Sequence, residues 1–440
     1  MNSLVDFALR NGGTEVQLEM PYRYKSTLGL SGANPSIFEY RGETYVNTRI
    51  LNYYKFFSNN NFNFLEDNCG LSVASGSRYC KSDNVIVNQK TGEEFYLKFP
   101  FYFNAEYNGL EDGKFVIWND KLYVYGTRCD VVKDKSIITI YELNDKFEIV
   151  KVINTNNGGI SKVEKNWMAV PDKPFYFLYE PKKPVVIKIN EDNGSFETVE
   201  VKRGNEVCQE QLRGNATMCR VDENRYIAIV HNSYEGGRKY RFKFVFYDNE
   251  FNAISSSDWF IFKNEMCEFC CGMKLTDGLL HISYSMFDCC SYVLSLPFDK
   301  IEEFCSKTIE SNYPTMFDSN YFFNLAISCE KKFSTSIPIF NYVVCTTNPF
   351  EPIHYESAVR MLTYYIRFKS VVEEHIKELK ELAMKYIMIF QDRCECYYIL
   401  SGLYKFEGDF EMYREMKRLG DERKNSMMPY FGYYLNPHYL

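Results

Sequence analysis

From about residue 30 to residue 350, short apolar runs alternate with turn residues along the sequence. The runs are rich in Val, Ile, Tyr and Phe, and Asn, Asp, Gly or Pro bounds each of them, which is typical of short β-strands. Two tight turns are explicit, Trp118-Asn-Asp-Lys121 and Asn193-Gly194, each between two apolar runs. Even spacing of short antiparallel strands predicts a β-sandwich, a barrel or a propeller. Examples of these runs are 43–50, 114–128, 136–143, 174–180, 184–189, 225–233, 241–248 and 279–286.

Polar motifs recur in this region at intervals close to the length of one propeller blade. They start at Asn34, Asp112, Glu164, Arg213 and Glu268, which are separated by 78, 52, 49 and 55 residues. Four strands with their turns need roughly 40 to 50 residues. The long first interval indicates an insertion between residues 56 and 80. The protein is therefore predicted to be mainly β, with a five-bladed β-propeller at residues 1–350 and one polar cluster per blade at the central channel.

The composition changes near Pro352, after which apolar residues recur at helical spacing. One apolar stripe runs from residue 376 to residue 390 and a second from 396 to 403. Gly408 is expected to end the second helix, and Gly420 a third. A helix pair joined by a Gly-Asp turn is similar to a tetratricopeptide-type hairpin. Residues 351–440 are therefore predicted to form an α-helical domain, which packs within the protein or mediates contact with a protein partner or a second copy.

Composition narrows the function classes. The chain has 440 residues, of which 45% are apolar and 25% charged, as in folded globular proteins. Its 36 Tyr and 36 Phe against 3 Trp favour a sheet-rich protein. The formal charge of −7 argues against a nucleic-acid-binding protein that neutralises phosphates.

Neither a membrane-spanning helix nor an export signal is predicted. No run of about 18 apolar residues occurs, and the N-terminal residues lack the basic start and apolar core of a signal peptide. Fifteen cysteines without an export signal predict reduced thiols and a cytoplasmic protein. Adjacent strand residues point to opposite faces, so the cysteine cluster is interpreted as buried hydrophobic residues and no metal is predicted. That cluster is Cys267, Cys270, Cys271, Cys289 and Cys290.

Two acidic motifs are candidates for chemistry. Glu111 and Asp112 precede the strand that starts at Lys114, and neighbouring carboxylates can be tuned to act as a general acid or base. The alternative is an exposed turn pair. The segment Glu164-Lys165-Asn166-Trp167 combines an aromatic face with hydrogen-bonding groups, which suits a sugar ring. The alternative is a strand with one core Trp.

Four basic residues are candidates for binding an anion. Arg49, Lys165 and Arg213 can hold phosphate by charge-assisted hydrogen bonds, although each alone is more often a surface ion pair. His231, at the end of an apolar run, can bind phosphate or donate to a substrate oxygen, although a buried core histidine is the default. No glycine-rich phosphate loop, His-Glu-x-x-His helix or serine nucleophile motif is present.

The motifs, in this order, resemble those of the five-bladed propeller glycosidases and phosphorylases of glycoside hydrolase family 130 and the related mannosyltransferases and phosphorylases of glycosyltransferase family 108. The likeness spans roughly residues 30 to 305. It departs where Gly113-Lys114 replaces Pro-Arg and where Ala-Val follows Met168. The matching segments are Asn34-Pro35-Ser36, Arg49, Asn52-Tyr53, Gly109 to Lys114, Glu164 to Met168, Arg213 to Thr217, His231, Glu268-Phe269 and Asp288.

The resemblance implies an inverting enzyme that transfers a mannose-like unit to or from a β-linked oligosaccharide, with Asp112 as general acid or base. It implies that Arg49, Lys165, Arg213 or His231 holds a co-substrate, which is inorganic phosphate, a sugar 1-phosphate or a sugar nucleotide. No other cofactor is implied. A transferase is slightly favoured over a phosphorylase or hydrolase, and a catalytically inactive glycan-binding propeller or a scaffold is the alternative. The implied sugar-binding residues are Asn34, Asn52, Tyr53, Glu111, Glu164, Asn166, Trp167, Glu268 and Asp288.

Overall fold

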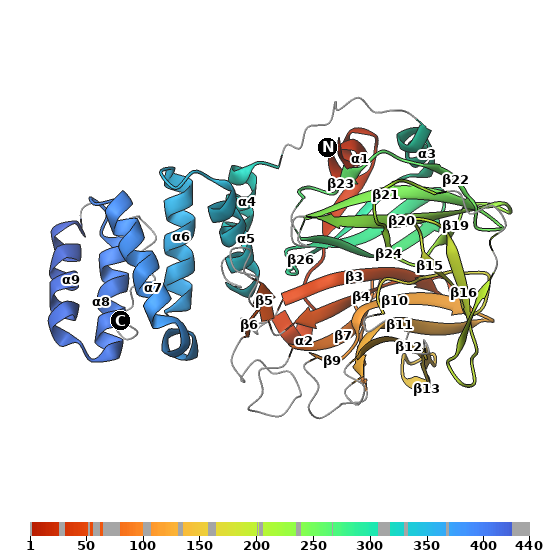
Figure 1. Cartoon of the computed structure of the whole chain (residues 1–440), viewed down its shortest axis with the longest axis horizontal. Helices are drawn as coiled ribbons and strands as arrows, with labels where there is room; N and C mark the ends of the chain where they lie inside the picture. The colour runs from red at the N-terminus through yellow and green to blue at the C-terminus, as the bar shows by residue number, and fades with distance from the viewer. Residues whose placement is uncertain are drawn as a thin grey trace. The chain divides into compact units, whose positions relative to one another are not determined.

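The computed structural model forms two compact units. The first is Met1–Tyr54 with Phe62–Met316 and is mainly β; the second is Lys55–Asn61 with Phe317–Leu440 and is mainly helical (Figure 1). The sequence placed the boundary at residue 350, whereas the structure assigns helices α4 (Ser319–Ser328) and α5 (Phe333–Thr346) to the second unit. The structure describes residues 2–25, 31–51, 53–55, 62–64, 80–99, 107–130, 135–156, 164–199, 201, 206–234, 239–265, 267–306, 317–329, 333–366 and 369–424.

The first unit consists of antiparallel sheets built from successive strands, which is the arrangement of a β-propeller. Four of these sheets have the four-stranded path of a blade. The short β9 (Tyr107–Asn108) is added in parallel to β7, and β5 (Tyr53–Lys55) and β6 (Phe62–Phe64) form a separate two-stranded sheet. In order across each sheet, the four are β3 (Ser31–Tyr40), β4 (Glu43–Leu51), β7 (Cys80–Asn88) and β8 (Glu94–Leu97); β10 (Glu111–Trp118), β11 (Lys121–Asp130), β12 (Lys135–Leu143) and β13 (Ile149–Asn154); β14 (Met168–Ala169), β15 (Tyr176–Glu180), β16 (Val185–Ile189) and β17 (Phe196–Val199); and β2 (Thr14–Gln17), β26 (Cys290–Pro297), β25 (Leu279–Met286) and β24 (Glu268–Thr276).

The remaining large sheet differs from a regular blade. It has seven strands, and its N-terminal strand β1 pairs in parallel with β23. The prediction of a five-bladed propeller is therefore wrong in its number of blades for the described part of the chain, which has four sheets with a blade's path and one larger sheet. Its strands are β1 (Asn2–Ser3), β18 (Arg213–Gly214), β19 (Cys219–Arg220), β20 (Arg225–Tyr234), β21 (Lys239–Asp248), β22 (Ala253–Ser256) and β23 (Phe260–Ile261).

The first strands of different sheets meet in the middle of this unit. β3 lies between β24 and β10 (Figure 1), and the Ser36 hydroxyl donates to the Cys271 carbonyl at 3.3 Å. Across the same region, the Thr217 hydroxyl donates to the Phe115 carbonyl at 2.9 Å. Strand β2, near the N-terminus, completes the sheet formed by β24 to β26. The chain's beginning thus pairs with the last of these sheets, as propeller closure requires.

The aromatic residues that predicted the strands pack between neighbouring sheets. Phe38 and Phe115 stack with ring centroids 4.0 Å apart, and the Trp118 indole donates to the Val170 carbonyl at 2.7 Å. The turn between β10 and β11 is confirmed: Asn119 and Asp120 have φ values of 49° and 60°, as a two-residue type I′ hairpin requires. Each of the strand runs named from the sequence coincides with one or two strands, with differences of at most three residues at the ends.

The second unit contains helices whose buried faces match the predicted apolar stripe. Leu379, Ala383 and Tyr386 are buried, and Gly408 ends α8 with a left-handed φ of 83°. The last helix ends at Glu422, two residues beyond the predicted end, and a tetratricopeptide-type repeat stays a prediction. The other helices of this unit are α6 (Pro352–Tyr365), α7 (Lys369–Ile389), α8 (Glu395–Glu407) and α9 (Phe410–Glu422), and those of the first are α1 (Leu4–Arg10), α2 (Tyr22–Lys25) and α3 (Phe298–Ser306).

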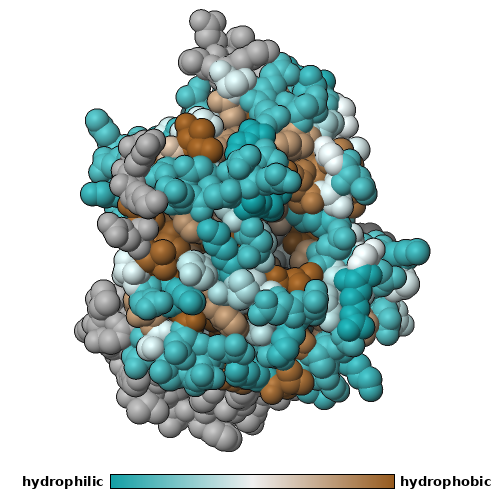
Figure 2. Space-filling view, turned by 90° about the vertical axis from the view of Figure 1, so that its right-hand side faces the viewer, coloured by the Kyte–Doolittle hydropathy of each residue, from teal (hydrophilic) through white to brown (hydrophobic). Residues whose placement is uncertain are grey.

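The surface mixes hydrophilic and hydrophobic residues, and the cysteines in the described residues form no disulfides. On the face in Figure 2, hydrophobic residues form small separate areas among hydrophilic ones, and a hollow opens near the middle. Among the helices that the structure describes, none has the length and apolar character needed to cross a membrane. Cysteines in the described residues are free thiols, and no group of three or more His, Cys, Asp or Glu among those residues could hold a metal ion.

Candidate active site

Asp112 lies at an irregular point of its strand. The pairing of β10 with β11 shifts register between Glu111 and Lys114, which is a β-bulge, and Asp112 has a left-handed φ of 55°. Bulges re-aim side chains and are frequent beside active sites. The backbone strain at a non-glycine residue persists only where the surroundings hold it. The alternative of an exposed turn pair does not hold, because the Asp112 carboxylate is fixed within the strand.

Two side chains hold the Asp112 carboxylate. The Asn34 amide donates to Oδ1 of Asp112 at 2.7 Å, and the Arg49 guanidinium lies 3.4 Å from the same oxygen. The Ser285 hydroxyl donates to the Asn34 carbonyl oxygen at 2.6 Å and so fixes which end of that amide faces Asp112. Residues from two sheets therefore orient a carboxylate that belongs to a third sheet.

Glu111 extends this cluster through two further ion pairs. Its carboxylate lies 3.8 Å from Arg49 and 3.6 Å from Lys165. Arg49 is almost fully buried, whereas Lys165 is partly exposed. Arg49 and Lys165 are therefore committed to carboxylates of the site, and their role as anion ligands would require them to exchange partners.

The cluster alters the acidity of Asp112. Burial raises the pKa of Asp112 and the neighbouring Glu111 charge raises it further, while Arg49, Lys114 and Lys165 act in the opposite direction. The net direction is upward, so the carboxyl group keeps its proton to a higher pH than an exposed aspartate. A carboxyl group of this kind suits proton donation near neutral pH.

The segment Glu164-Lys165-Asn166-Trp167 is divided between the core and the surface: Glu164 and Trp167 are buried, and Lys165 is exposed. Trp167 is 1% exposed and packs its ring against Phe177, Tyr179 and Phe196, so the alternative of a core Trp is right and the predicted pocket wall is wrong. The Glu164 carboxylate accepts hydrogen bonds from the Trp167 indole at 3.1 Å and from the Tyr179 hydroxyl at 3.2 Å. Glu164 therefore orients this aromatic core, which corrects its predicted role as a sugar ligand.

Asn166 and Arg213 lie on neighbouring segments at the same end of the sheets. Asn166 is half-buried with a left-handed φ of 63°, and its carbonyl oxygen would lie 2.3 Å from a Cβ at Gly214. Only glycine allows this close approach. The Arg213 side chain is exposed beside it. Sugar binding by Asn166 and anion binding by Arg213 stay predictions.

His231 is buried and neutral. Its Nδ1 lies 2.7 Å from the Asn215 amide oxygen, and the Asn215 amide donates to the Cys270 carbonyl at 3.2 Å. Burial lowers the pKa of His231 to about 3, with the Arg213 and Lys114 charges acting in the same direction. The ring therefore joins β20 to β24, as the default interpretation of a core histidine expects.

Glu268 serves the backbone. It is fully buried, and its carboxylate accepts hydrogen bonds from the amides of Phe262, Lys263 and Asn264 at 2.7, 2.7 and 3.0 Å. Because the side chain is fully buried and bound to these amides, Glu268 is not accessible to a sugar in this structure. Burial nevertheless raises the pKa of Glu268 to about 8 against the lowering effect of these amides.

The remaining predicted residues are placed less fully. Asp288 lies in the turn between β25 and β26 with a left-handed φ of 53°. Asn52 lies outside the described residues. Tyr53 lies in β5, and its side chain is likewise outside the described part. Ser285, which sequence reasoning missed, belongs to the alternating polar series 281, 283 and 285 of one strand, and that alternation was a usable signal.

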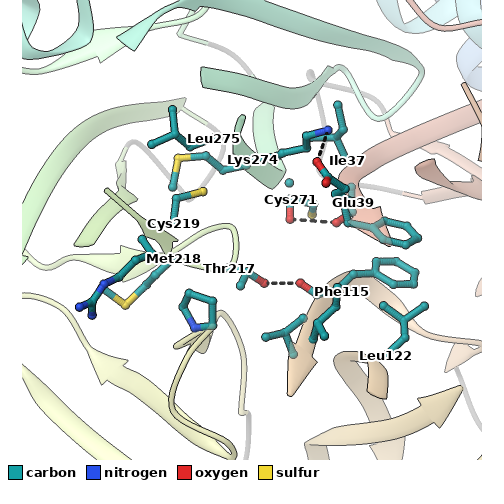
Figure 3. Close-up of a pocket in the computed structure, with 18 residues that line it drawn as sticks. Ile37, Glu39, Phe115, Leu122, Thr217, Met218, Cys219, Cys271, Lys274 and Leu275 are labelled. Carbon is teal, nitrogen blue, oxygen red and sulfur yellow. Dashed lines mark hydrogen bonds and ion pairs between the residues drawn. The ribbon is translucent and has the colours of Figure 1, made fainter. Parts of the chain in front are cut away.

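A cavity of about 260 Å³ lies further along the same inner strands (Figure 3). Ile37, Leu122 and Leu275 are among its apolar lining residues, and Glu39 and Lys274 form an ion pair at 2.9 Å in its wall. Residues 36–39 of β3, 115–117 of β10 and 271–275 of β24 are part of its lining, whereas Asn34, Asp112 and Glu268 come earlier in the same three strands. The strands thus contribute to the Asp112 cluster first and to the cavity afterwards.

No protein-family model matches this chain, and no curated protein does. Solved structures match parts of this chain at low identity. A β-1,2-mannobiose phosphorylase from Listeria innocua is 14% identical with a TM-score of 0.43, covering 66% of this chain and 99% of that one. A mannose phosphorylase from Leishmania mexicana is 12% identical with a TM-score of 0.38, covering 66% and 90%. A glycosyl hydrolase from Bacteroides ovatus is 10% identical with a TM-score of 0.39, covering 60% and 83%. This similarity does not assign an activity.

Proposed function

We propose that this protein is an enzyme of glycosyl transfer in which Asp112 is the general acid or base. The observation that carries the proposal is the Asp112 carboxyl group, which is held by Asn34 and Arg49 at a strained bulge and has a raised pKa. A fixed carboxyl group with raised pKa is what proton donation to a glycosidic oxygen requires. The resemblance of the surrounding motifs supplies the substrate class, a β-linked and mannose-like oligosaccharide.

The proposed reaction is an inverting displacement. Protonated Asp112 donates its proton to the leaving oxygen, directly or through a sugar hydroxyl, as the bond from that oxygen to C1 breaks. Phosphate attacks C1 from the opposite face, which forms the sugar 1-phosphate and leaves Asp112 ionised. In the synthetic direction Asp112 removes the acceptor's proton while the phosphate of a sugar 1-phosphate or sugar nucleotide leaves. A transferase stays slightly favoured over a phosphorylase or hydrolase.

The contacts within the fold leave fewer of the residues predicted from the sequence as candidates for ligand binding. Asn166 and Asp288 remain candidates for sugar hydroxyls, since neither is fully enclosed by a core. Arg213 is the best placed of the predicted anion ligands because its side chain is exposed, whereas Arg49 and Lys165 face carboxylates. These are assignments for the substrate-bound state.

The test is a turnover screen with mannose 1-phosphate, sugar nucleotides and mannose oligosaccharides plus phosphate. We expect turnover with one donor, and a loss of roughly 10² to 10⁴-fold in Asp112→Asn with retained ligand binding. Asp120→Asn is the matched control, because Asp120 occupies a hairpin turn whose left-handed φ of 60° asparagine also tolerates. Equal activity of Asp112→Asn and wild type would refute the catalytic role of Asp112.

A glycan-binding protein without catalysis is the second candidate. The replacement of Pro-Arg by Gly113-Lys114 favours it, as does the use of Glu164, Trp167 and Glu268 in internal contacts. This candidate predicts that mannose oligosaccharides bind wild type and Asp112→Asn equally well while no donor in the screen turns over.

A further inference from the structure

The cavity of about 260 Å³ is bounded toward the Asp112 cluster by two hydrogen bonds between sheets. The Ser36 hydroxyl donates to the Cys271 carbonyl at 3.3 Å, and the Thr217 hydroxyl donates to the Phe115 carbonyl at 2.9 Å (Figure 3). These four residues come first among the lining residues of their segments, so they lie between the Asp112 cluster and the rest of the cavity. A ligand in the cavity would therefore occupy a different site from the sugar of the proposed reaction.

The walls of the cavity are apolar and rich in sulfur. In the view of Figure 3, Met218 and Leu275 lie on one side of the cavity, and Phe115 and Leu122 lie on the other. Burial raises the pKa of Cys219 to about 12, so its thiol is neutral. A methionine thioether makes favourable contacts with aromatic rings, which favours an aromatic ligand. The sulfur-containing lining residues are Met218, Cys219, Cys271 and Met273.

The charged groups of the lining already have partners within the fold. Lys274 Nζ lies 2.9 Å from the Glu39 carboxylate and donates to the Thr44 hydroxyl at 2.7 Å. The Arg220 guanidinium donates to the Asp172 carboxylate at 2.8 Å. An ionic ligand would have to displace one of these pairs at the cost of a buried or half-buried charge. The lining therefore favours an uncharged ligand.

The edges of three inner strands turn backbone groups toward the cavity. β3, β10 and β24 are edge strands of their sheets, and each ends in a two-residue turn with left-handed φ at both positions. The residue before such a turn hydrogen-bonds to the residue after it, and hydrogen-bonded positions alternate along the strand. Every second residue therefore directs its N–H and C=O groups away from the paired strand. The turns are Arg41-Gly42, Asn119-Asp120 and Asp277-Gly278.

The residues selected by this alternation all line the cavity. Two contacts agree with the assignment, because the Ile37 amide donates to the Ser283 hydroxyl at 2.9 Å and the Phe115 carbonyl accepts from Thr217. A carbonyl oxygen accepts up to two hydrogen bonds, so these edges can receive a donor from a ligand. The residues are Ile37, Glu39, Phe115, Ile117, Met273 and Leu275.

The size of the cavity limits the ligand to one or two rings. An apolar cavity of about 150 Å³ holds benzene, and drug-sized ligands occupy about 300–1,000 Å³. We propose that the cavity binds a small, uncharged aromatic molecule of the size of indole that carries one N–H or O–H donor. Its ring packs between the two apolar walls, and its donor bonds to a carbonyl group of an inner strand edge. This site is independent of the proposed glycosyl transfer.

The experiment is calorimetric titration of the full chain with indole and with N-methylindole, which lacks the donor. We expect indole to bind in roughly the millimolar range or tighter, and N-methylindole to bind roughly two- to tenfold more weakly. Absence of indole binding would overturn the proposal, and equal affinities would overturn the assigned hydrogen bond. Mannose oligosaccharides should leave the affinity for indole unchanged, whether or not any donor turns over. Displacement of indole by them would overturn the separation from the sugar site.

The matched variants are Ile117→Trp and Val152→Trp. Both residues lie in edge strands of one sheet and are similarly exposed, at 37% and 39%, but of the two only Ile117 lines the cavity. Ile117→Trp should fill the cavity and weaken indole binding by roughly tenfold or more, and Val152→Trp should bind as wild type does. Unchanged binding by Ile117→Trp would overturn the proposal. If Ile117→Trp does not fold, methionine methyl NMR of wild type decides, because the proposal requires indole to shift the resonances of Met218 and Met273.

Discussion

The backbone of the inner strands differs between the end that carries Asp112 and the end that lines the cavity. At the Asp112 end, Asn34, Asp112, Asn166 and Asp288 all have left-handed φ values, and the pairing of β3 with β4 and of β10 with β11 is interrupted by bulges. At the cavity end, the same strands pair without register shifts, and residues such as Ile117 and Leu122 face each other in the β10–β11 ladder. In β3 and β10 the bulges and the left-handed residues thus lie at the Asp112 end, whereas β24 shifts register against β25 between Cys270 and Gly272, next to the cavity.

The difference shows why only one end is a candidate for catalysis. Backbone strain persists where surrounding contacts hold it, and it concentrates at functional sites. Asn and Asp tolerate the left-handed region better than other residues, so the same residue types supply both the backbone geometry and the polar groups. At the cavity end, hydrogen bonds such as Thr217 to the Phe115 carbonyl satisfy the polar groups internally.

The largest expected effect is on stability and tests the core role of Trp167. Trp167→Ala should reduce the free energy of unfolding by about 3–5 kcal/mol, because it leaves a cavity among Phe177, Tyr179 and Phe196. Denaturant unfolding measures this loss, and Trp167→Phe, which keeps most of the ring volume, should lose less. If Trp167→Ala instead kept its stability and bound sugar more weakly, Trp167 would be a ligand contact and not a core residue.

The next effect concerns the electrostatics of Asp112. Arg49→Met removes the guanidinium that stabilises the ionised carboxylate, so the pKa of Asp112 should rise. If protonated Asp112 is the acid, the fall of kcat/KM at high pH should move to higher pH, and turnover should drop by roughly 10²-fold through lost positioning.

The pH profile of the Arg49→Met enzyme is the measurement, and Arg41→Met is its control. Arg41 pairs with Asp145 at the surface, where both side chains are more than half exposed. If the pH profile of Arg49→Met superimposed on that of wild type, Arg49 would have no effect on the pKa of Asp112.

The sequence predicted the positions of the strands and of the polar motifs better than it predicted the contacts that the polar residues make. The Tyr- and Phe-rich runs specify strands locally, and the Asn119-Asp120 turn follows from residue type alone. Asp112 and Asn34 were found because their motifs are contiguous in the chain. Their partner Ser285 comes from a strand 251 residues beyond Asn34, and only the closure of the sheets brings the two together.

The site residues that were predicted wrongly are buried in the fold. Glu164, Trp167 and Glu268 have the residue types of a sugar site, but hydrogen bonds within the fold consume their polar groups. Whether a polar side chain faces a core or a channel depends on register and on neighbouring sheets, which a single sequence does not contain. The first helices of the second unit were missed because α5 carries Pro338 and β-branched residues, which weaken helical patterns.

A smaller loss of stability is expected at Glu268, whose carboxylate accepts hydrogen bonds from backbone amides. Glu268→Gln places an amide donor opposite three backbone amides and should cost about 1.5–3 kcal/mol of stability. The wild-type carboxyl group has a pKa near 8 in the fold and near 4.5 when unfolded, so the folded state binds the extra proton between these values. Stability should therefore fall as pH rises from about 4.5 to about 8.

The contribution of Glu268 to this slope is measured by denaturant unfolding at several pH values. It should approach at most about 1.4 kcal/mol per pH unit in wild type and be absent in Glu268→Gln. Glu250→Gln, an exposed substitution in the turn after β21, is the control. Parallel slopes for wild type and Glu268→Gln would show that Glu268 does not carry the proton.

The smallest expected effect lies at the cavity end, where Glu39 and Lys274 are 2.9 Å apart. Because the Glu39 side chain is 43% exposed, water screens this pair, and Glu39→Gln should change stability by at most about 1 kcal/mol. A double-mutant cycle with Lys274→Met isolates the pair, although Lys274 also donates to Thr44 and its single variant should cost more. Turnover and its pH profile should remain as in wild type, since no charge near Asp112 changes. A tenfold loss of turnover in Glu39→Gln would instead mean that the cavity communicates with Asp112 along the inner strands, and the division between a strained catalytic end and a regular structural end would have to be abandoned.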